Sequence, residues 1–277
     1  MTDARSELVG RLVARGLLAR EATWLVDEFF IADDPDFTSA VMVAAERRLA
    51  GEPLQYILGH WPFRHCDLDV DARVLIPRPE TEELVDIAVR ELARGDRGAP
   101  MIADLGTGSG AIVVSLLSEL TERGVQASAI AVDISEDALA VARRNARKYH
   151  LTNVSFVQSS WWREVNPDLR GRFDVVMANP PYIGRDEQPL TDSELSFEPS
   201  TALFADDARG TSGFAEVANI IATTGPWLSP SGVLIVEHGF RQGPAAVDLA
   251  HASGFASAVT VTDLAGHDRF VVAKEWS

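Results

Sequence analysis

The sequence predicts an α/β fold in which a mostly parallel sheet is covered by helices on both faces. Seven short segments rich in β-branched and other apolar residues predict strands, and helical stretches separate most of them. Strands that are apolar throughout are typical of a parallel sheet buried between two layers of helices. A glycine-rich turn follows the first strand and a proline-rich turn follows the fourth, so a ligand site is expected at their shared edge.

The predicted strands lie in the second part of the chain, at Met101–Leu105, Ala127–Val132, Val154–Gln158, Phe173–Ala178, Gly232–Glu237, Ala258–Asp263 and Arg269–Ala273. Apolar residues recur at helical spacing in Glu80–Arg94, Ile112–Arg123 and Ser135–Tyr149, which predicts helices there. This strand and helix region is expected to form one domain over residues 80–277.

The first part of the chain has a different pattern. Apolar residues at helical spacing predict a small helical domain over residues 1–53, broken at residues 33–36 and closed by Gly51 as a C-cap. From Leu54 to Ile76 the pattern changes to short extended pieces, so we expect a β-hairpin or extended linker over residues 54–79.

Composition excludes several classes of protein. The chain has 41 acidic and 25 basic residues and a net charge of −16, which disfavours direct nucleic-acid binding through phosphate contacts. No apolar run approaches the roughly 20 residues that span a bilayer, and the N-terminus lacks a signal-peptide core, so we expect a cytoplasmic protein without a membrane partner. A single cysteine, Cys66, excludes an internal disulfide and a multi-cysteine metal site, and no metal is expected.

The glycine-rich turn reads Asp104-Leu105-Gly106-Thr107-Gly108-Ser109-Gly110 and leads directly into a predicted helix. Glycines let a ligand approach the main chain because no Cβ intervenes. Asp133, at the end of the next strand, can accept two hydrogen bonds from ribose hydroxyls. This layout is typical of an adenosine-binding domain, but it also satisfies the dinucleotide pattern and so leaves NAD and S-adenosylmethionine open.

The tetrapeptide Asn179-Pro180-Pro181-Tyr182 follows the fourth predicted strand and distinguishes the two cofactors. An amide or adenine amino nitrogen is a weak nucleophile, because its lone pair is delocalised. The Asn179 side-chain carbonyl and the Pro180 backbone carbonyl can accept its two N–H groups, while the prolines fix the backbone and the Tyr182 ring offers a stacking surface.

The tetrapeptide therefore predicts in-line methyl transfer that depends on positioning and on hydrogen bonds to developing charge. Asn179, Pro180 and Tyr182 are predicted to be catalytic, and Pro181 completes the predicted substrate-binding set. S-adenosylmethionine is the expected cofactor, with S-adenosylhomocysteine as its product.

The chain resembles the bacterial HemK/PrmC family of peptide chain release factor N5-glutamine methyltransferases over nearly its whole length. The motifs that carry the resemblance are Pro53 to Gly59 with Phe63, Leu75-Ile76-Pro77-Arg78-Pro79-Glu80-Thr81-Glu82, Asp104 to Gly110, Asp133, Asn179 to Tyr182, Phe197-Glu198-Pro199 with Ala202-Leu203, and Glu237-His238-Gly239. The Ile-Pro-Arg-Pro-Glu-Thr-Glu run is the most restricted of them to this family.

The resemblance implies a Rossmann-like, seven-stranded class I S-adenosylmethionine-dependent methyltransferase domain, preceded by a helical domain that helps to hold the release factor and by a hairpin linker. It implies that the glutamine of the release factor's Gly-Gly-Gln motif is the substrate. We expect the enzyme to be a monomer. Cofactor contacts carry over to Gly106, Thr107, Gly108, Ser109, Gly110, Asp133 and Asn179. The family's tryptophan matches Trp161, which would pack on the adenine, but this chain has Ser160 where the family usually has an acidic residue.

Some residues of these motifs also have ordinary structural interpretations. Arg78, Glu80 and Glu82 could cap and solvate the following helix. Glu237 and His238 could simply end the fifth strand.

Other functions remain open at this point. A ribosomal-protein glutamine methyltransferase shares most of these motifs, and an adenine-N6 nucleic-acid methyltransferase uses the same tetrapeptide but usually carries a basic surface. A nicotinamide dehydrogenase explains the glycine turn but leaves Asn179 to Tyr182 without a role. In a non-catalytic cofactor-binding scaffold, intact acceptors at Asn179 and Tyr182 would be superfluous.

Overall fold

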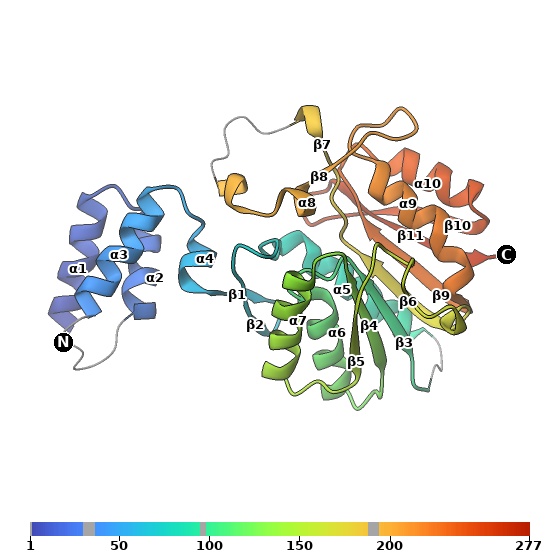
Figure 1. Cartoon of the computed structure of the whole chain (residues 1–277), viewed down its shortest axis with the longest axis horizontal. Helices are drawn as coiled ribbons and strands as arrows, with labels where there is room; N and C mark the ends of the chain where they lie inside the picture. Colours follow the sequence, from blue (N-terminus) through green and yellow to red (C-terminus); the bar gives the residue numbers. More distant parts are fainter. Residues whose placement is uncertain (1, 30–36, 95–97, 188–193) are drawn as a thin grey trace.

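A computed structural model describes residues 2–29, 37–94, 98–187 and 194–277 (Figure 1). Its centre is a seven-stranded sheet built from β3 (Met101–Leu105), β4 (Ser128–Asp133), β5 (Val154–Gln158), β6 (Phe173–Ala178), β9 (Leu228–Glu237), β10 (Phe255–Thr262) and β11 (Asp268–Trp276). The strand order is β10-β11-β9-β6-β3-β4-β5. The seven predicted strands are confirmed. The largest boundary difference is in β9, which begins at Leu228 and not at Gly232.

The sheet is parallel except at one strand. β3 pairs in parallel with β4 on one side and with β6 on the other, and β6 pairs in parallel with β9. Only β11 runs antiparallel, to both β9 and β10. Because the chain crosses from one side of β3 to the other, the carboxyl ends of β3 and β6 form a topological switch point, where ligands of such sheets bind.

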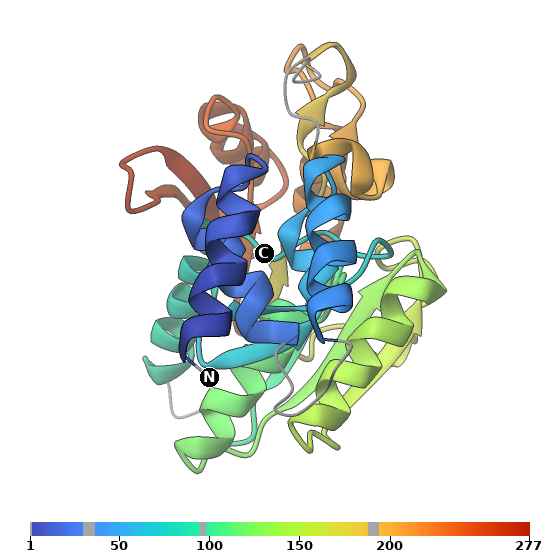
Figure 2. The ribbon, with the colours of Figure 1, turned by 90° about the vertical axis from the view of Figure 1, so that its left-hand side faces the viewer.

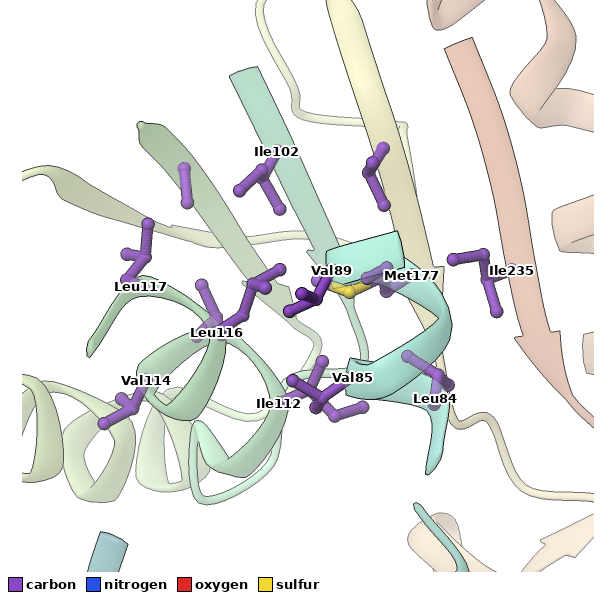
Figure 3. Close-up of a cluster of buried hydrophobic side chains, with 14 of the residues drawn as sticks. Leu84, Val85, Val89, Ile102, Ile112, Val114, Leu116, Leu117, Met177 and Ile235 are labelled. Atoms are coloured by element: carbon purple, nitrogen blue, oxygen red, sulfur yellow. The ribbon is translucent and has the colours of Figure 1, made fainter. Parts of the chain in front are cut away.

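Helices cover both faces of the sheet, as the sequence predicts. One layer contains α5 (Glu82–Ala93), α6 (Ala111–Glu122) and α7 (Glu136–Lys148), and the other contains α9 (Ala215–Thr224) and α10 (Gly243–Ala252). Figure 3 shows the first layer, where Val85 of α5 and Ile112 of α6 meet Met177 of β6 in a buried cluster. These apolar strands and one-sided helices can bury their surfaces only against each other.

The N-terminal part forms a separate helical bundle of α1 (Thr2–Ala14), α2 (Ala19–Phe29) and α3 (Phe37–Leu49), seen from its own side in Figure 2. Leu12, Leu25 and Ala45 are fully buried in its core. The predicted break at residues 33–36 lies outside the described residues. No helix in the described parts of the chain is long and apolar enough to cross a bilayer.

The linker contains both a helix and a hairpin. The expectation of extended structure from Leu54 is wrong, because Leu54–Leu58 forms a short helix, α4. Pro53 precedes this helix with φ of −55°, Leu54 and Ile57 pack into the bundle core, and Gly59 ends it in the left-handed conformation. Tertiary packing therefore overrides the β-like composition.

The hairpin follows α4 as β1 (His60–Phe63) and β2 (Cys66–Asp69). Its buried residues Phe63, Cys66 and Leu68 join the cluster beneath α5 and α6, so the hairpin is anchored to the sheet domain. Cys66 is thus a buried packing residue with a free thiol.

Candidate active site

Two cavities meet at the carboxyl edge of the sheet. The larger cavity, about 340 Å³, is lined by residues that follow four parallel strands: Gly106, Gly108, Asp133, Ser160, Trp161 and Asn179. The smaller cavity, about 240 Å³, is lined by Arg78, Glu80, Tyr182 and Leu195 among others. Asn179, Pro180 and Pro181 line both, so this turn is a shared wall between two spaces.

The glycine turn forms the floor of the larger cavity. The N–H groups of Gly106 and Thr107 donate to the Val132 carbonyl at 2.8 and 2.9 Å, which ties the turn to the end of β4. Gly108 has φ of +55°, and a Cβ added there would meet no atom within 4 Å, so its main chain faces open space. A ligand can therefore touch the backbone directly.

Asp133 is held so that its carboxylate faces the same cavity. Its Oδ2 accepts from the Gly108 N–H and its Oδ1 from the Ser135 N–H, each at 2.9 Å. Burial raises the pKa of Asp133 above its ordinary value, although these backbone hydrogen bonds oppose the rise. Each carboxylate oxygen keeps further acceptor capacity, which fits a pair of ribose hydroxyls.

The remaining glycine-turn residues lie beneath the cavity surface and support it. The Thr107 hydroxyl donates to Asp104 at 2.6 Å, and the Ser109 carbonyl accepts from the Asn145 side chain at 2.8 Å. A Cβ on Gly110 would lie 3.2 Å from that of Ala142, so Gly110 allows α6 and α7 to approach closely. Thr107, Ser109 and Gly110 are therefore not among the residues that line the larger cavity, in contrast to Gly106 and Gly108.

Trp161 follows β5 and lines the larger cavity. It adopts φ of +52°, and its indole N–H donates to Glu216 Oε2 at 2.7 Å. Its ring lies against Gly106, where an added Cβ would come within 3.3 Å. Ser160 and the 64% exposed Ile134 line the same space. A flat, partly apolar slot beside Asp133 suits a purine ring.

Asn179 follows β6 and is oriented by a residue outside the tetrapeptide. Its Nδ2 donates to the Thr81 hydroxyl at 3.0 Å, so its Oδ1 is the amide atom left for other partners. Thr81 ends the short 3-10 helix Pro79–Thr81 and is 3% exposed. Both cavities are lined by Asn179, and a carbonyl acceptor is thus available at their junction.

Glu237, at the end of β9, lies beneath this junction and is fully buried. Its Oε2 accepts from the Thr81 hydroxyl at 2.7 Å and its Oε1 from the Tyr182 hydroxyl at 3.1 Å. Burial raises the pKa of Glu237 to about 7, against the hydrogen bond from Thr81, and the Glu80 carboxylate adds to the rise. Burial likewise raises the pKa of Tyr182.

The structural interpretation of Glu237 as a mere strand end is therefore incomplete, since it bonds to a predicted catalytic residue. Both Glu237 and Thr81 belong to motifs that carry the family resemblance, but the sequence pattern predicts no functional role for either. His238 is buried, with its Nδ1 at 2.9 Å from the Gly239 carbonyl, and burial lowers its pKa.

The charged residues of the Ile-Pro-Arg-Pro-Glu-Thr-Glu run have separate roles. Arg78 pairs with the buried Glu198 at 2.5 Å, and Glu198 also accepts from the Ile76 N–H at 3.0 Å. Glu82 accepts from the Arg64 N–H at 3.0 Å. Glu80 lines the smaller cavity. Arg78 thus fixes the run against the segment near α8 (Ser200–Leu203), which a helix-capping role does not require.

Comparison with known proteins places these features in a wider context. Residues 98–237 match the family described as "Methyltransferase domain". A protein named release factor glutamine methyltransferase from Aliivibrio fischeri is 39% identical over 231 residues, which cover 83% of this chain and 76% of the relative. One of the same name from Xylella fastidiosa (strain 9a5c) is 35% identical and covers 99% of this chain and 96% of the relative.

Solved structures share the fold at low sequence identity. The hMettl16 catalytic domain, crystallised in complex with the MAT2A 3′UTR hairpin 6, aligns with a TM-score of 0.58 and 14% identity over 90% of this chain and 84% of that one. A methyltransferase from Pyrococcus furiosus aligns with a TM-score of 0.51 and 13% identity over 84% of this chain and 98% of that one. At these identities the likeness concerns the fold alone.

Proposed function

The chain belongs to the release factor glutamine methyltransferase family, and we propose that it methylates the side-chain amide N5 of the glutamine in the Gly-Gly-Gln motif of peptide chain release factors. The observation that carries the proposal is the orientation of Asn179. Its Nδ2 is bound to Thr81, so its carbonyl oxygen is presented where the two cavities meet.

S-adenosylmethionine would occupy the larger cavity and supply the electrophilic methyl group. Asp133 would bind the ribose hydroxyls, because its carboxylate is fixed by two backbone donors and still has free lone pairs. Gly106 and Gly108 would let the cofactor approach the main chain, and Trp161 would pack along the adenine. Thr107, Ser109 and Gly110 would act by holding the turn in shape.

The glutamine side chain would enter through the smaller cavity. Asn179 Oδ1 and the Pro180 carbonyl would each accept one N–H of the amide, which turns the nitrogen lone pair toward the methyl group. Positive charge develops on nitrogen during transfer, and fixed carbonyl dipoles stabilise it without reorganising. Pro181 and Tyr182 would limit the amide to one plane by contact with its flat faces.

The charge of the chain supports a protein substrate over a nucleic acid. At a net charge of −16 the chain would repel a phosphate backbone. Glu80 lines the smaller cavity, and the buried Glu237 bonds to Tyr182, which lines the same cavity. We propose that the enzyme acts in the cytoplasm as a monomer on release factors.

The experiment is mass spectrometry of a purified release factor incubated with the enzyme and S-adenosylmethionine. We expect a gain of about 14 Da on the Gly-Gly-Gln glutamine, the mass of one methylene. The control is the same release factor with that glutamine replaced by alanine, which should gain nothing. Parallel reactions should contain ribosomal proteins and an adenine-containing oligonucleotide, and transfer to either of these but not to the release factor would refute the proposal.

A further inference from the structure

Thr81 lies between Asn179 and Glu237 in a continuous chain of hydrogen bonds. The Asn179 Nδ2 donates to Thr81 at 3.0 Å, and Thr81 donates to Glu237 at 2.7 Å. A threonine hydroxyl has one hydrogen to donate. Because the Glu237 carboxylate takes that hydrogen, the oxygen of Thr81 can only accept from Asn179, and the amide must turn its nitrogen toward Thr81.

We infer that Thr81 and Glu237 are positioning residues that determine which end of the Asn179 amide meets the substrate. The inference rests on the proposed function, since it assumes that the Asn179 carbonyl is the working group. An asparagine amide is nearly symmetric in shape, so packing alone distinguishes its two ends poorly. The direction of the hydrogen bonds distinguishes the two ends of the amide. Here the Glu237 carboxylate sets that direction by accepting the Thr81 hydrogen.

Glu237 also positions a second group of the site. Its Oε1 accepts from the Tyr182 hydroxyl at 3.1 Å, while the Tyr182 carbonyl accepts from the Gln242 side chain at 3.1 Å. One fully buried carboxylate therefore orients both the amide acceptor and the ring beside it. Each of the two carboxyl oxygens accepts from one hydroxyl, so the Glu237 side chain holds both hydroxyls at once.

Burial of this carboxylate would be hard to explain as packing alone. Removing a carboxylate from water costs free energy, and an apolar residue of similar size would fill the space without that cost. The charged and titratable groups that act on Glu237 are Glu80 before α5, Tyr182 after β6 and Arg269 on β11. The charge of Arg269 and the hydrogen bond from Tyr182 favour its ionised form, and the charge of Glu80 opposes it. The buried Glu237 carboxylate costs free energy and bonds to both Thr81 and Tyr182, which fits a positioning role.

The first test compares Thr81→Val, which keeps the shape but removes the hydroxyl, with Thr81→Ser, which keeps the hydroxyl. We expect Thr81→Val to lower kcat on the release factor roughly tenfold to a hundredfold, as loss of alignment does, with the cofactor Kd unchanged. Thr81→Ser should retain most of the wild-type kcat. The matched control is Thr121→Val, which removes the hydroxyl of an exposed residue in the last turn of α6 that donates to the Leu117 carbonyl. Wild-type kcat in Thr81→Val, or an equal loss in Thr81→Ser, would overturn the inference.

A double-mutant cycle separates positioning from a general structural effect. In an Asn179→Ala background the Thr81→Val change should have no further effect on the single-turnover rate, because its target is gone. If the two losses multiply, Thr81 acts independently of Asn179 and the inference fails. Glu237→Gln provides a second route, since a side-chain amide cannot accept from both hydroxyls, and it should lower kcat even if Thr81→Val proves unstable.

A failure of the proposed function can be distinguished from a failure of the positioning inference. If the wild-type enzyme leaves the release factor glutamine unmethylated, the proposed function is wrong whatever the variants do. The positioning role is then decided by crystal structures of wild type and Thr81→Val with S-adenosylhomocysteine, at about 1.2 Å or better so that the amide nitrogen and oxygen can be told apart. We expect the Asn179 amide to keep its orientation in wild type and to rotate in the variant, and an unchanged amide would overturn the inference.

Discussion

Asp133 in the larger cavity is held by main-chain N–H groups, whereas Asn179, between the two cavities, is held by side chains from distant parts of the sequence. Gly108 and Ser135 hold Asp133 through backbone N–H groups in two turns of adjacent strands. At the other end, Thr81 and Glu237 are separated by 156 residues. Changes around Asp133 are therefore expected to act on cofactor binding, while changes around Asn179 should act on turnover.

Asn179→Ala should produce the largest effect and tests the second half of this comparison. We expect kcat to fall about 10²- to 10³-fold, the cost of losing one donor or acceptor aimed at the transition state. The cofactor Kd, measured by calorimetric titration, should change little. A loss of cofactor affinity with an unchanged single-turnover rate would mean that Asn179 acts in cofactor binding and not in turnover.

The free energy of unfolding should depend on pH because the Glu237 carboxyl is buried. The pKa of Glu237 is raised from 4.5 to about 7 in the folded protein, so the folded state holds a proton that the unfolded state has lost between these values. The free energy of unfolding should therefore fall as pH rises through that window, by as much as about 3 kcal/mol at about 1.4 kcal/mol for each pKa unit.

Urea unfolding of wild type and Glu237→Gln at several pH values measures this contribution. The difference in unfolding free energy between the two should vary from about pH 4.5 to about pH 7 and level off above it. Glu122→Gln, at an exposed site, is the control and should run parallel to wild type. A pH-independent difference for Glu237→Gln would mean that its carboxyl titrates normally.

Asp133→Ala tests the role of the carboxylate that the backbone N–H groups hold in the larger cavity. We expect cofactor affinity to fall roughly tenfold to a hundredfold, because hydrogen bonds to a charged group contribute about 1.5–3 kcal/mol. At saturating cofactor, kcat should stay close to wild type. If kcat stays low at saturating cofactor, Asp133 affects turnover as well as cofactor binding.

Trp161→Phe should have the smallest effect. The substitution keeps a ring but removes the N–H that donates to Glu216, a bond of 2.7 Å. Loss of one such hydrogen bond, at about 0.5–1.5 kcal/mol, should weaken cofactor binding by a factor of about 2 to 10. The measurement is again calorimetric titration, with Trp276→Phe at the end of β11 as a control. Equal affinity in wild type and Trp161→Phe would mean that this contact does not help to shape the cavity.

The strands could be predicted closely because burial leaves a strong local signal. Met101–Leu105, Val154–Gln158 and Phe173–Ala178 have the same bounds in the prediction and in the structure. The α4 helix could not be predicted in this way, since Leu54 and Ile57 are helical on account of the bundle against which they pack. Local composition does not contain that information.

The site contacts also differ in whether the sequence predicts them. Asp133 and Gly108 were predicted together, because each follows a neighbouring strand and the geometry of a parallel sheet brings them close. The bond from Thr81 to Glu237 depends on where a segment before α5 crosses the end of β9. Nothing local in either segment indicates that crossing, so only the folded chain reveals it.

The position of Thr81 also affects how this protein can be divided. The stretch matched by the general methyltransferase family spans residues 98–237 and contains Asp133, Asn179 and Glu237. It leaves out Thr81, which lies twelve residues after the end of the hairpin at Asp69, in a run that Arg78 ties to Glu198. A protein engineer who trims the chain to that stretch, or grafts it onto another recognition module, would keep Asp133 and the glycine turn but lose the hydroxyl to which the Asn179 amide donates.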